Sequence, residues 1–176
     1  ILALVFGYLS VVALVNFGRV AFAPLLEPLQ AAFGVGPAAA GLVASLAWFG
    51  TAVIRIPTGY LLTRVPRYRV VLWTGGMLAS GAVLAALAPS LPVLGAAAFV
   101  LGASSGAYFV AAIPLIGELY PDGVGSAVGI HGTASQVAAV AAPGVVVATL
   151  AVADWRATFW LLAVAIAYLA SPAPLP

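Results

Sequence analysis

The sequence predicts an all-α membrane protein, a bundle of six transmembrane helices, and three observations lead to this fold class. The 176 residues are 65% hydrophobic. Only 6% are charged, against about 25% in an ordinary soluble domain. The apolar stretches are also long enough to cross a bilayer, because a spanning helix needs about 20 apolar residues. Helices that face lipid need no charged surface, whereas a soluble domain of this length would have too few charged residues for its water-exposed surface.

Short segments that contain glycine, proline or charged residues divide the apolar sequence. The breaks lie at residues 34–37, 64–69, 89–92, 120–123 and 153–156, and such clusters are typical of turns. We therefore expect one domain with spans at residues 3–32, 38–62, 69–88, 92–119, 125–151 and 155–171.

The arginine-rich break between spans two and three sets the expected orientation. It contains Arg64, Arg67 and Arg69, and short loops of this kind stay on the cytoplasmic side. Six spans then place both ends of this segment in the cytoplasm, and we expect a multi-pass protein of the plasma membrane. The lipid bilayer is thus an expected partner.

The composition also excludes several kinds of site. There is no cysteine and only one histidine, so thiolate sites and two-histidine metal motifs are absent from the chain. The net charge of +2 includes no basic run with interleaved polar residues, so no nucleic-acid partner is expected. We expect no catalytic residue, no metal and no cofactor, because the sequence has no nucleophile–base pair and no paired carboxylates on one helix face.

A few polar side chains lie within the expected spans, and they are the candidates for function. An ionised side chain near the bilayer centre costs at least about 2.5–3.5 kcal/mol, so it usually pairs inside the bundle or lines an aqueous path. The candidate lining residues of a substrate cavity are Asn16, Arg19, Trp48, Arg55, Tyr108, His131 and Gln136.

Three of these candidates allow two interpretations each. Arg19 shares a helical arc with Asn16 and Glu27, and it either faces an anionic substrate group or pairs with a carboxylate on a neighbouring helix. Arg55 either contacts substrate or extends its long stem to the membrane interface. His131 is either a proton site or an interhelical hydrogen-bond partner.

Glycines four residues apart indicate where helices approach closely. Gly102 and Gly106 lie on span four, and Gly125 and Gly129 lie on span five. This spacing lets two backbones come together in lipid. The alternative is chance spacing in a glycine-rich chain.

The sequence also contains a weak internal repeat of proline and glycine positions. A Pro, Gly, Pro series in the first two spans recurs with similar spacing in spans four and five, as in the three-plus-three repeats of transporters. The two series are Pro24, Gly41, Pro57 and Pro114, Gly129, Pro143.

The segment that closes span two and opens span three resembles the loop signature of the major facilitator superfamily, a Gly-x-Leu-x-Asp-Arg-x-Gly-Arg-Arg pattern. The matching positions are Gly59, Leu61, Arg64 and Arg67, with Arg69 one place beyond the second arginine. Thr63 replaces the aspartate of the pattern and Pro66 its inner glycine. The Gly-Glu-Leu-Tyr-Pro segment at residues 117–121 similarly resembles the Ala-Glu-Leu-Phe-Pro close of helix four in the family.

This resemblance implies a fold and a set of roles. Family members have twelve helices in two six-helix halves, and the chain looks like the N-terminal half, a 3+3 inverted-repeat bundle. The residues that the resemblance assigns to the gating loop motif are Gly59, Arg64, Arg67, Arg69 and Glu118.

The resemblance also implies a membrane secondary transporter of a small solute that works by alternating access. Arg19 and Arg55 suggest a small organic anion as the small-molecule substrate. A second six-helix half of the same polypeptide would complete the path, with a homodimer as the alternative. An oligomeric channel or passive pore and an intramembrane enzyme remain open, although the sequence has neither a selectivity loop nor a catalytic constellation.

Overall fold

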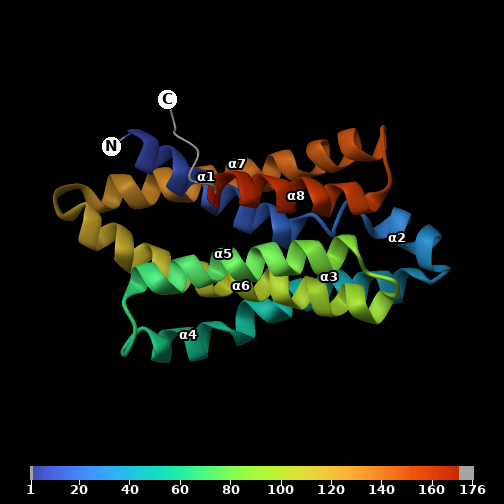
Figure 1. Ribbon diagram of the computed structural model, residues 1–176, viewed down its shortest axis with the longest axis horizontal. Helices are drawn as coiled ribbons and strands as arrows, with labels where there is room; N and C mark the ends of the chain where they lie inside the picture. The colour runs from blue at the N-terminus through green and yellow to red at the C-terminus, as the bar shows by residue number, and fades with distance from the viewer. Residues whose placement is uncertain (1, 171–176) are drawn as a thin grey trace.

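The helices of the protein run side by side along one long axis (Figure 1). The computed structural model describes residues 2–170, with side chains from Leu9 onward. Its elements, in chain order, are α1 (Leu2–Val20), α2 (Leu26–Phe33), α3 (Pro37–Val53), α4 (Arg55–Leu61), α5 (Arg67–Ala86), α6 (Leu91–Leu119), the 3-10 helix η1 (Pro121–Gly123), α7 (Val124–Leu150) and α8 (Trp155–Ala170). These residues contain helices and no strand, so the predicted all-α class is confirmed.

Four helical stretches within the described residues are long and apolar enough to cross a membrane. They are Pro37–Leu61, Arg67–Ala86, Leu91–Leu119 and Pro121–Leu150. Two shorter apolar helices, Leu9–Val20 and Trp155–Ala170, accompany them. A helix advances about 1.5 Å per residue, so the 19 residues of α1 reach nearly as far as the 20 residues of α5, whereas the 16 described residues of α8 reach less far.

Prolines explain where the first two expected spans are interrupted. Helix α1 ends at Val20 and α3 ends at Val53, each four residues before a proline, Pro24 and Pro57. A proline ring clashes with the carbonyl four residues earlier and donates no N–H. The stretch expected as one span at residues 3–32 is therefore two helices, α1 and α2, which a turn at residues 21–25 separates.

The two prolines of the second repeat, Pro114 and Pro143, do not interrupt their helices. Pro114 lies inside α6 and Pro143 inside α7, and both helices continue through them. Proline position alone thus does not decide the breaks. Neighbouring helices can hold a proline-containing helix together in a membrane bundle.

Helix α6 forms the centre of the bundle and packs closely against α3. A Cβ on Gly102 would lie 1.7 Å from the carbonyl oxygen of Ala47, and one on Gly106 would lie 2.3 Å from that of Thr51. The hydroxyl of Thr51 lies 2.9 Å from the carbonyl oxygen of Gly102. The close helix approach that the sequence predicted for Gly102 and Gly106 is confirmed.

The second glycine pair does not make such a contact. A Cβ on Gly125 or Gly129 would meet no atom within 4 Å. These two glycines lie on α7, which faces outward over most of its length, since 17% of its most apolar window is buried. The prediction of a close helix contact at this pair is wrong for the described residues.

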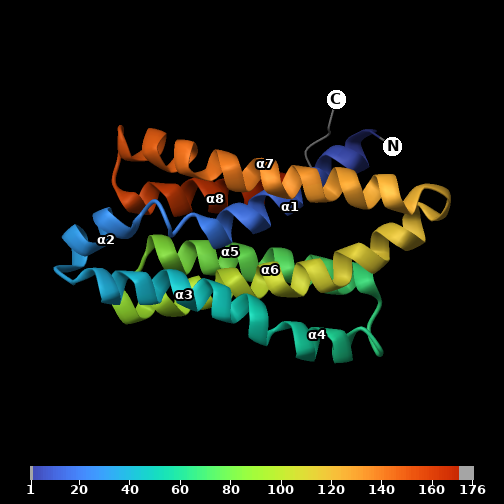
Figure 2. The ribbon, with the colours of Figure 1, turned by 180° about the vertical axis from the view of Figure 1, so that it is seen from behind.

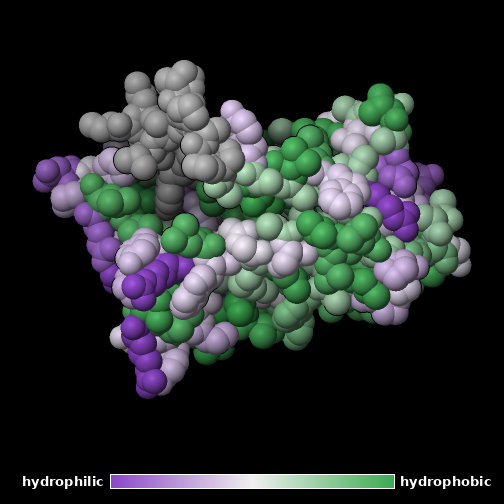
Figure 3. Space-filling view, viewed as in Figure 1, coloured by the Kyte–Doolittle hydropathy of each residue, from purple (hydrophilic) through white to green (hydrophobic). Residues whose placement is uncertain are grey.

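Polar residues gather at the two ends of the bundle (Figure 3). In that view the middle is mainly hydrophobic, and the strongly hydrophilic surface lies toward both ends of the long axis. The turn at residues 64–69 and η1 lie at one end, whereas the α5–α6 and α7–α8 turns lie at the other (Figures 1 and 2). The distribution is the one expected when the long axis crosses a bilayer.

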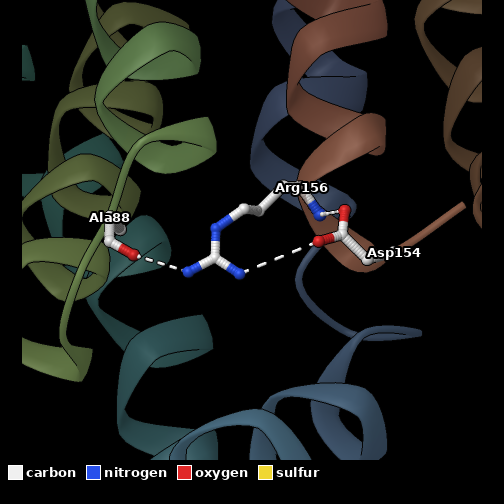
Figure 4. A network of polar contacts seen from close by, with 3 residues as sticks. All are labelled: Ala88, Asp154 and Arg156. Carbon is white, nitrogen blue, oxygen red and sulfur yellow. Dashed lines mark hydrogen bonds and ion pairs between the residues drawn. The ribbon is translucent and has the colours of Figure 1, made fainter.

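An arginine joins the two turns at that other end (Figure 4). Arg156 donates a hydrogen bond to the carbonyl oxygen of Ala88 at 3.0 Å. Its guanidinium also lies 3.8 Å from the Asp154 carboxylate, and Asp154 accepts a hydrogen bond from the Arg156 backbone N–H at 3.1 Å. The contact ties the start of α8 to the end of α5.

Candidate substrate site

Arg19 is a partly buried cation in the last turn of α1. Its guanidinium donates a hydrogen bond to Oδ1 of Asn16 at 2.5 Å and lies 4.4 Å from the ring centre of Trp48 on α3. Its Nε atom is buried and has no hydrogen-bond acceptor among the described residues. The arginine is thus held by an amide and an aromatic ring and retains hydrogen-bonding capacity.

No carboxylate compensates the charge of Arg19 within residues 9–170, where the two ion pairs are Arg67–Glu118 and Arg156–Asp154. The helical arc expected to join Arg19 to Glu27 is interrupted, because Glu27 lies on α2 beyond the turn at 21–25 and is exposed. The interpretation of Arg19 as half of a structural ion pair therefore has no support in this part of the chain.

Asn16 connects Arg19 to α7. Its side chain is fully buried, and its Nδ2 donates a hydrogen bond to the carbonyl oxygen of Ser135 at 2.6 Å. The oxygen of the same amide accepts from Arg19. The amide of Asn16 therefore bonds to α7 through its nitrogen and to Arg19 through its oxygen. For this reason the position of Arg19 depends on the position of α7.

A second buried pair, Tyr108 and His131, lies near the first. His131 is on the same face of α7 as Ser135, one helical turn earlier. Oη of Tyr108 on α6 and Nε2 of His131 on α7 are 3.1 Å apart. The two rings stack at 5.7 Å, and the Phe109 ring meets the imidazole edge-on at 5.7 Å. The interhelical hydrogen-bond interpretation of His131 accords with this geometry.

The other predicted lining residues are not gathered into one site. Trp48 is 56% exposed although one face of its ring covers Arg19. Arg55, at the start of α4, and Gln136, on α7, are exposed. These three side chains lie on the open faces of α3, α4 and α7, where a further protein surface or an aqueous path can meet them.

The predicted gating loop residues lie at one end of the bundle. Arg67, at the start of α5, pairs with Glu118, near the end of α6. Arg64 covers the ring of Tyr60 at 4.8 Å, and Nε of Arg69 donates to the hydroxyl of Tyr68 at 3.2 Å. Within the described residues, the structure therefore joins two of the five predicted residues directly. The fifth, Gly59, is exposed on α4.

Sequence reasoning missed two components of this arrangement. One is the backbone carbonyl of Ser135, which anchors Asn16, and the other is the ring of Phe109 against His131. Neither has a sequence signal, because every residue has a carbonyl and phenylalanine is common in apolar spans. In residues 2–170 no group of three or more His, Cys, Asp or Glu side chains is placed to hold a metal ion.

The comparison with protein families decides the class of the molecule. The family model described as Major Facilitator Superfamily matches residues 8–171. The chain belongs to the major facilitator superfamily. No individual curated protein matches it.

Membership in the superfamily confirms the resemblance noted in the loop motif and fits a six-helix half of its fold. The protein is a multi-pass membrane transporter of the major facilitator type, and its partners include membrane lipid and a small-molecule substrate. Members of the superfamily are transporters and not enzymes.

Proposed function

We propose that this major facilitator superfamily chain forms one half of a secondary transporter that carries a small organic anion by alternating access. The observation that carries the proposal is the guanidinium of Arg19, which lies between Asn16 and Trp48 with no carboxylate partner in residues 9–170. A cation in hydrocarbon is costly. Because the neighbours of Arg19 are uncharged, a negatively charged ligand is favoured as its partner.

The chemistry of the site suits a carboxylate or phosphate group. Guanidinium binds such anions through parallel N–H donors with defined geometry. The amide of Asn16 occupies one nitrogen of Arg19 and leaves Nε without an acceptor. Trp48 offers a cation–π contact that stabilises the charge while no anion is bound, by about 0.5–2 kcal/mol.

The open faces of α3 and α7 support the presence of a second wall for the substrate path. Trp48 and Gln136 project from these faces, and substrate sites of such transporters lie near the midplane between repeats. In the proposal a second six-helix half, most simply of the same polypeptide, covers these faces, and the six-helix unit rocks against it. A homodimer is the alternative arrangement.

Two contacts would take part in the rocking motion. The Arg67–Glu118 pair joins α5 to α6 at the end that we assign to the cytoplasm, and the Asn16 amide joins α1 to α7 beside Arg19. Movement of α7 would therefore reposition Arg19. In this way the site would change its exposure and its affinity together.

The test is anion uptake by proteoliposomes that contain the full polypeptide carrying residues 1–176. A panel of radiolabelled small carboxylates and phosphate esters serves to find a transported anion, with protein-free vesicles as the blank. Arg19→Leu should abolish uptake of that anion while the variant inserts and unfolds at a normal temperature. Arg19→Lys keeps the charge but loses the planar fork of donors, and it should retain weak uptake with a raised KM.

Three outcomes would contradict the proposal. If Arg19→Leu transports the anion with an unchanged KM, Arg19 does not bind it. If the variant fails to insert or fold, Arg19 has a structural role instead. Flux that rises without saturation at high anion concentration would favour a passive pore.

A further inference from the structure

An apolar groove lies between α1, α7 and α8, on a different side of α1 from the candidate substrate site. Its volume is about 220 Å³, and it is open on one side. Each of its lining residues is apolar, among them Ala13 and Phe17 on α1, Ala138 and Ala141 on α7, and Leu161 and Ala165 on α8. Small alanine side chains on all three helices create the space.

The groove is separate from the path proposed for the substrate. Successive residues of a helix are rotated by about 100°, which places Phe17 about 160° and Ala13 about 120° from Arg19 around α1. An anion held by Arg19 therefore does not reach the groove. The α7 wall, by contrast, continues the face that carries Ser135, the partner of Asn16.

The size and lining of the groove restrict what can fill it. Water is disfavoured, because cavities without polar groups stay dry. The rim continues into exposed apolar side chains such as Val140 and Val164, and the protein spans a membrane. A flexible hydrocarbon chain from the bilayer fits these conditions.

We propose that this groove binds one acyl chain of a membrane lipid. The acyl chain is already in the hydrocarbon interior of the bilayer before it binds, so its binding gains little from the hydrophobic effect. The gain comes from dispersion contacts with walls that would otherwise border a void. A bound chain supports α7 against α1 and α8 beside the Asn16–Ser135 hydrogen bond, and so stabilises the helix that positions Arg19.

The experiment uses phosphatidylcholine with a photoreactive diazirine midway along one acyl chain, mixed into vesicles that contain the full polypeptide. After illumination, labelled peptides are mapped by mass spectrometry. Peptides that contain Ala138, Ala141 and Ala165 should carry more label than those around Leu72 and Trp73, which are exposed apolar residues on α5.

Two variants of one helix make the comparison specific. Ala165→Leu fills the groove with a side chain and should reduce labelling there to the level seen on α5. Ala167→Leu adds the same atoms at an exposed position of α8 that does not line the groove, and it should leave the labelling unchanged. If Ala165→Leu does not fold, Ala138→Leu fills the groove from the α7 wall.

Three results would overturn the proposal. The first is equal labelling of all exposed apolar faces, and the second is unchanged labelling in the groove-filling variant. The third is attachment of groove peptides to another protein segment by a short cross-linker, which would make that segment the occupant.

Discussion

At the scale of single residues, the environment of Arg19 is the most informative feature of the molecule. A lone arginine within apolar helices usually meets a carboxylate, but here an amide and an indole ring surround it. Asn16 is fully buried and makes a hydrogen bond with each end of its amide. Its role in the proposal is to position Arg19 and not to contact the substrate.

We predict that Asn16→Asp weakens anion binding. The new carboxylate would lie within hydrogen-bond distance of the guanidinium, pair with it and compete with the substrate. It would also lose the donor to the Ser135 carbonyl. The apparent affinity for the transported anion should fall at least about tenfold, the equivalent of about 1.4 kcal/mol, as measured by KM in proteoliposomes.

A matched control separates this effect from a general effect of added charge. Gln30→Glu makes the same amide-to-carboxylate change on α2, where the Gln30 side chain bonds only to the Leu26 carbonyl within the described residues. Its KM should stay normal. An unchanged KM in Asn16→Asp would show that Asn16 does not position the binding group.

At the scale of helices, α3 and α6 approach each other closely enough for glycines of one to face the backbone of the other. Gly50, Gly102 and Gly106 each face a backbone carbonyl of the opposite helix. The hydroxyl of Thr51 lies between the two backbones, 2.9 Å from the oxygens of Ala47 and Gly102. Without side chains at these positions, dispersion and polar contacts hold the helices together, as is usual in lipid.

We predict that Gly102→Ala destabilises the protein. Its Cβ would lie 1.7 Å from the carbonyl oxygen of Ala47, so the helices would have to move apart. Overpacking of this kind costs about 1–3 kcal/mol. The midpoint of thermal unfolding in detergent should fall.

Gly129→Ala on α7 is the comparison for this variant, because its Cβ meets no atom within 4 Å. There the higher helix propensity of alanine, up to about 1 kcal/mol, should leave stability unchanged or raise it. Equal unfolding midpoints for the two variants would show that the close α3–α6 contact does not contribute to stability.

At the scale of the whole molecule, charge defines two different ends. One end carries Arg64, Arg67 and Arg69, and the other carries the Arg156–Asp154 pair beside Ala88. Short arginine-rich segments are retained on the cytoplasmic side. Helix α1 begins, and helix α8 ends, toward the arginine-rich end (Figures 1 and 2).

Cysteine labelling tests this orientation, and the absence of cysteine from the 176 residues makes the background low. Tyr68→Cys should react with a membrane-impermeant maleimide only in inverted or permeabilised membranes. Ala153→Cys, in the turn at the opposite end, should react in intact cells. Reversed labelling of the two positions would contradict the assigned orientation.

The open faces of α3 and α7 lead to a prediction about assembly. Residues 1–176 alone, reconstituted as a verified monomer, should not transport, because the candidate site would have one wall and Gln136 would face lipid. Co-expression with a second six-helix half should restore saturable uptake. Transport by the monomer would refute the requirement, and transport only at densities that favour self-association would indicate a homodimer.

The sequence by itself determined the class of the protein, its family and the turns near residues 34–37, 64–69, 89–92, 120–123 and 153–156, but not the turn at residues 21–25. Hydropathy, turn residues and the arginine cluster are local properties that add along the chain, and a bilayer responds to their sums. For this reason the ends of α5, α6 and α7 lie within a few residues of those expected. The candidate residues were also recognisable, because polar groups are rare among so many apolar ones.

Only the tertiary structure decided which of these residues contact one another. Gly102 and Gly106 have the same spacing as Gly125 and Gly129, yet only the first pair faces another backbone. Arg67 finds Glu118, 51 residues away, and Asn16 finds a carbonyl 119 residues away. Such meetings depend on how each helix is rotated and which neighbour it packs against, and those properties arise from the packing of the whole bundle and not from any one segment.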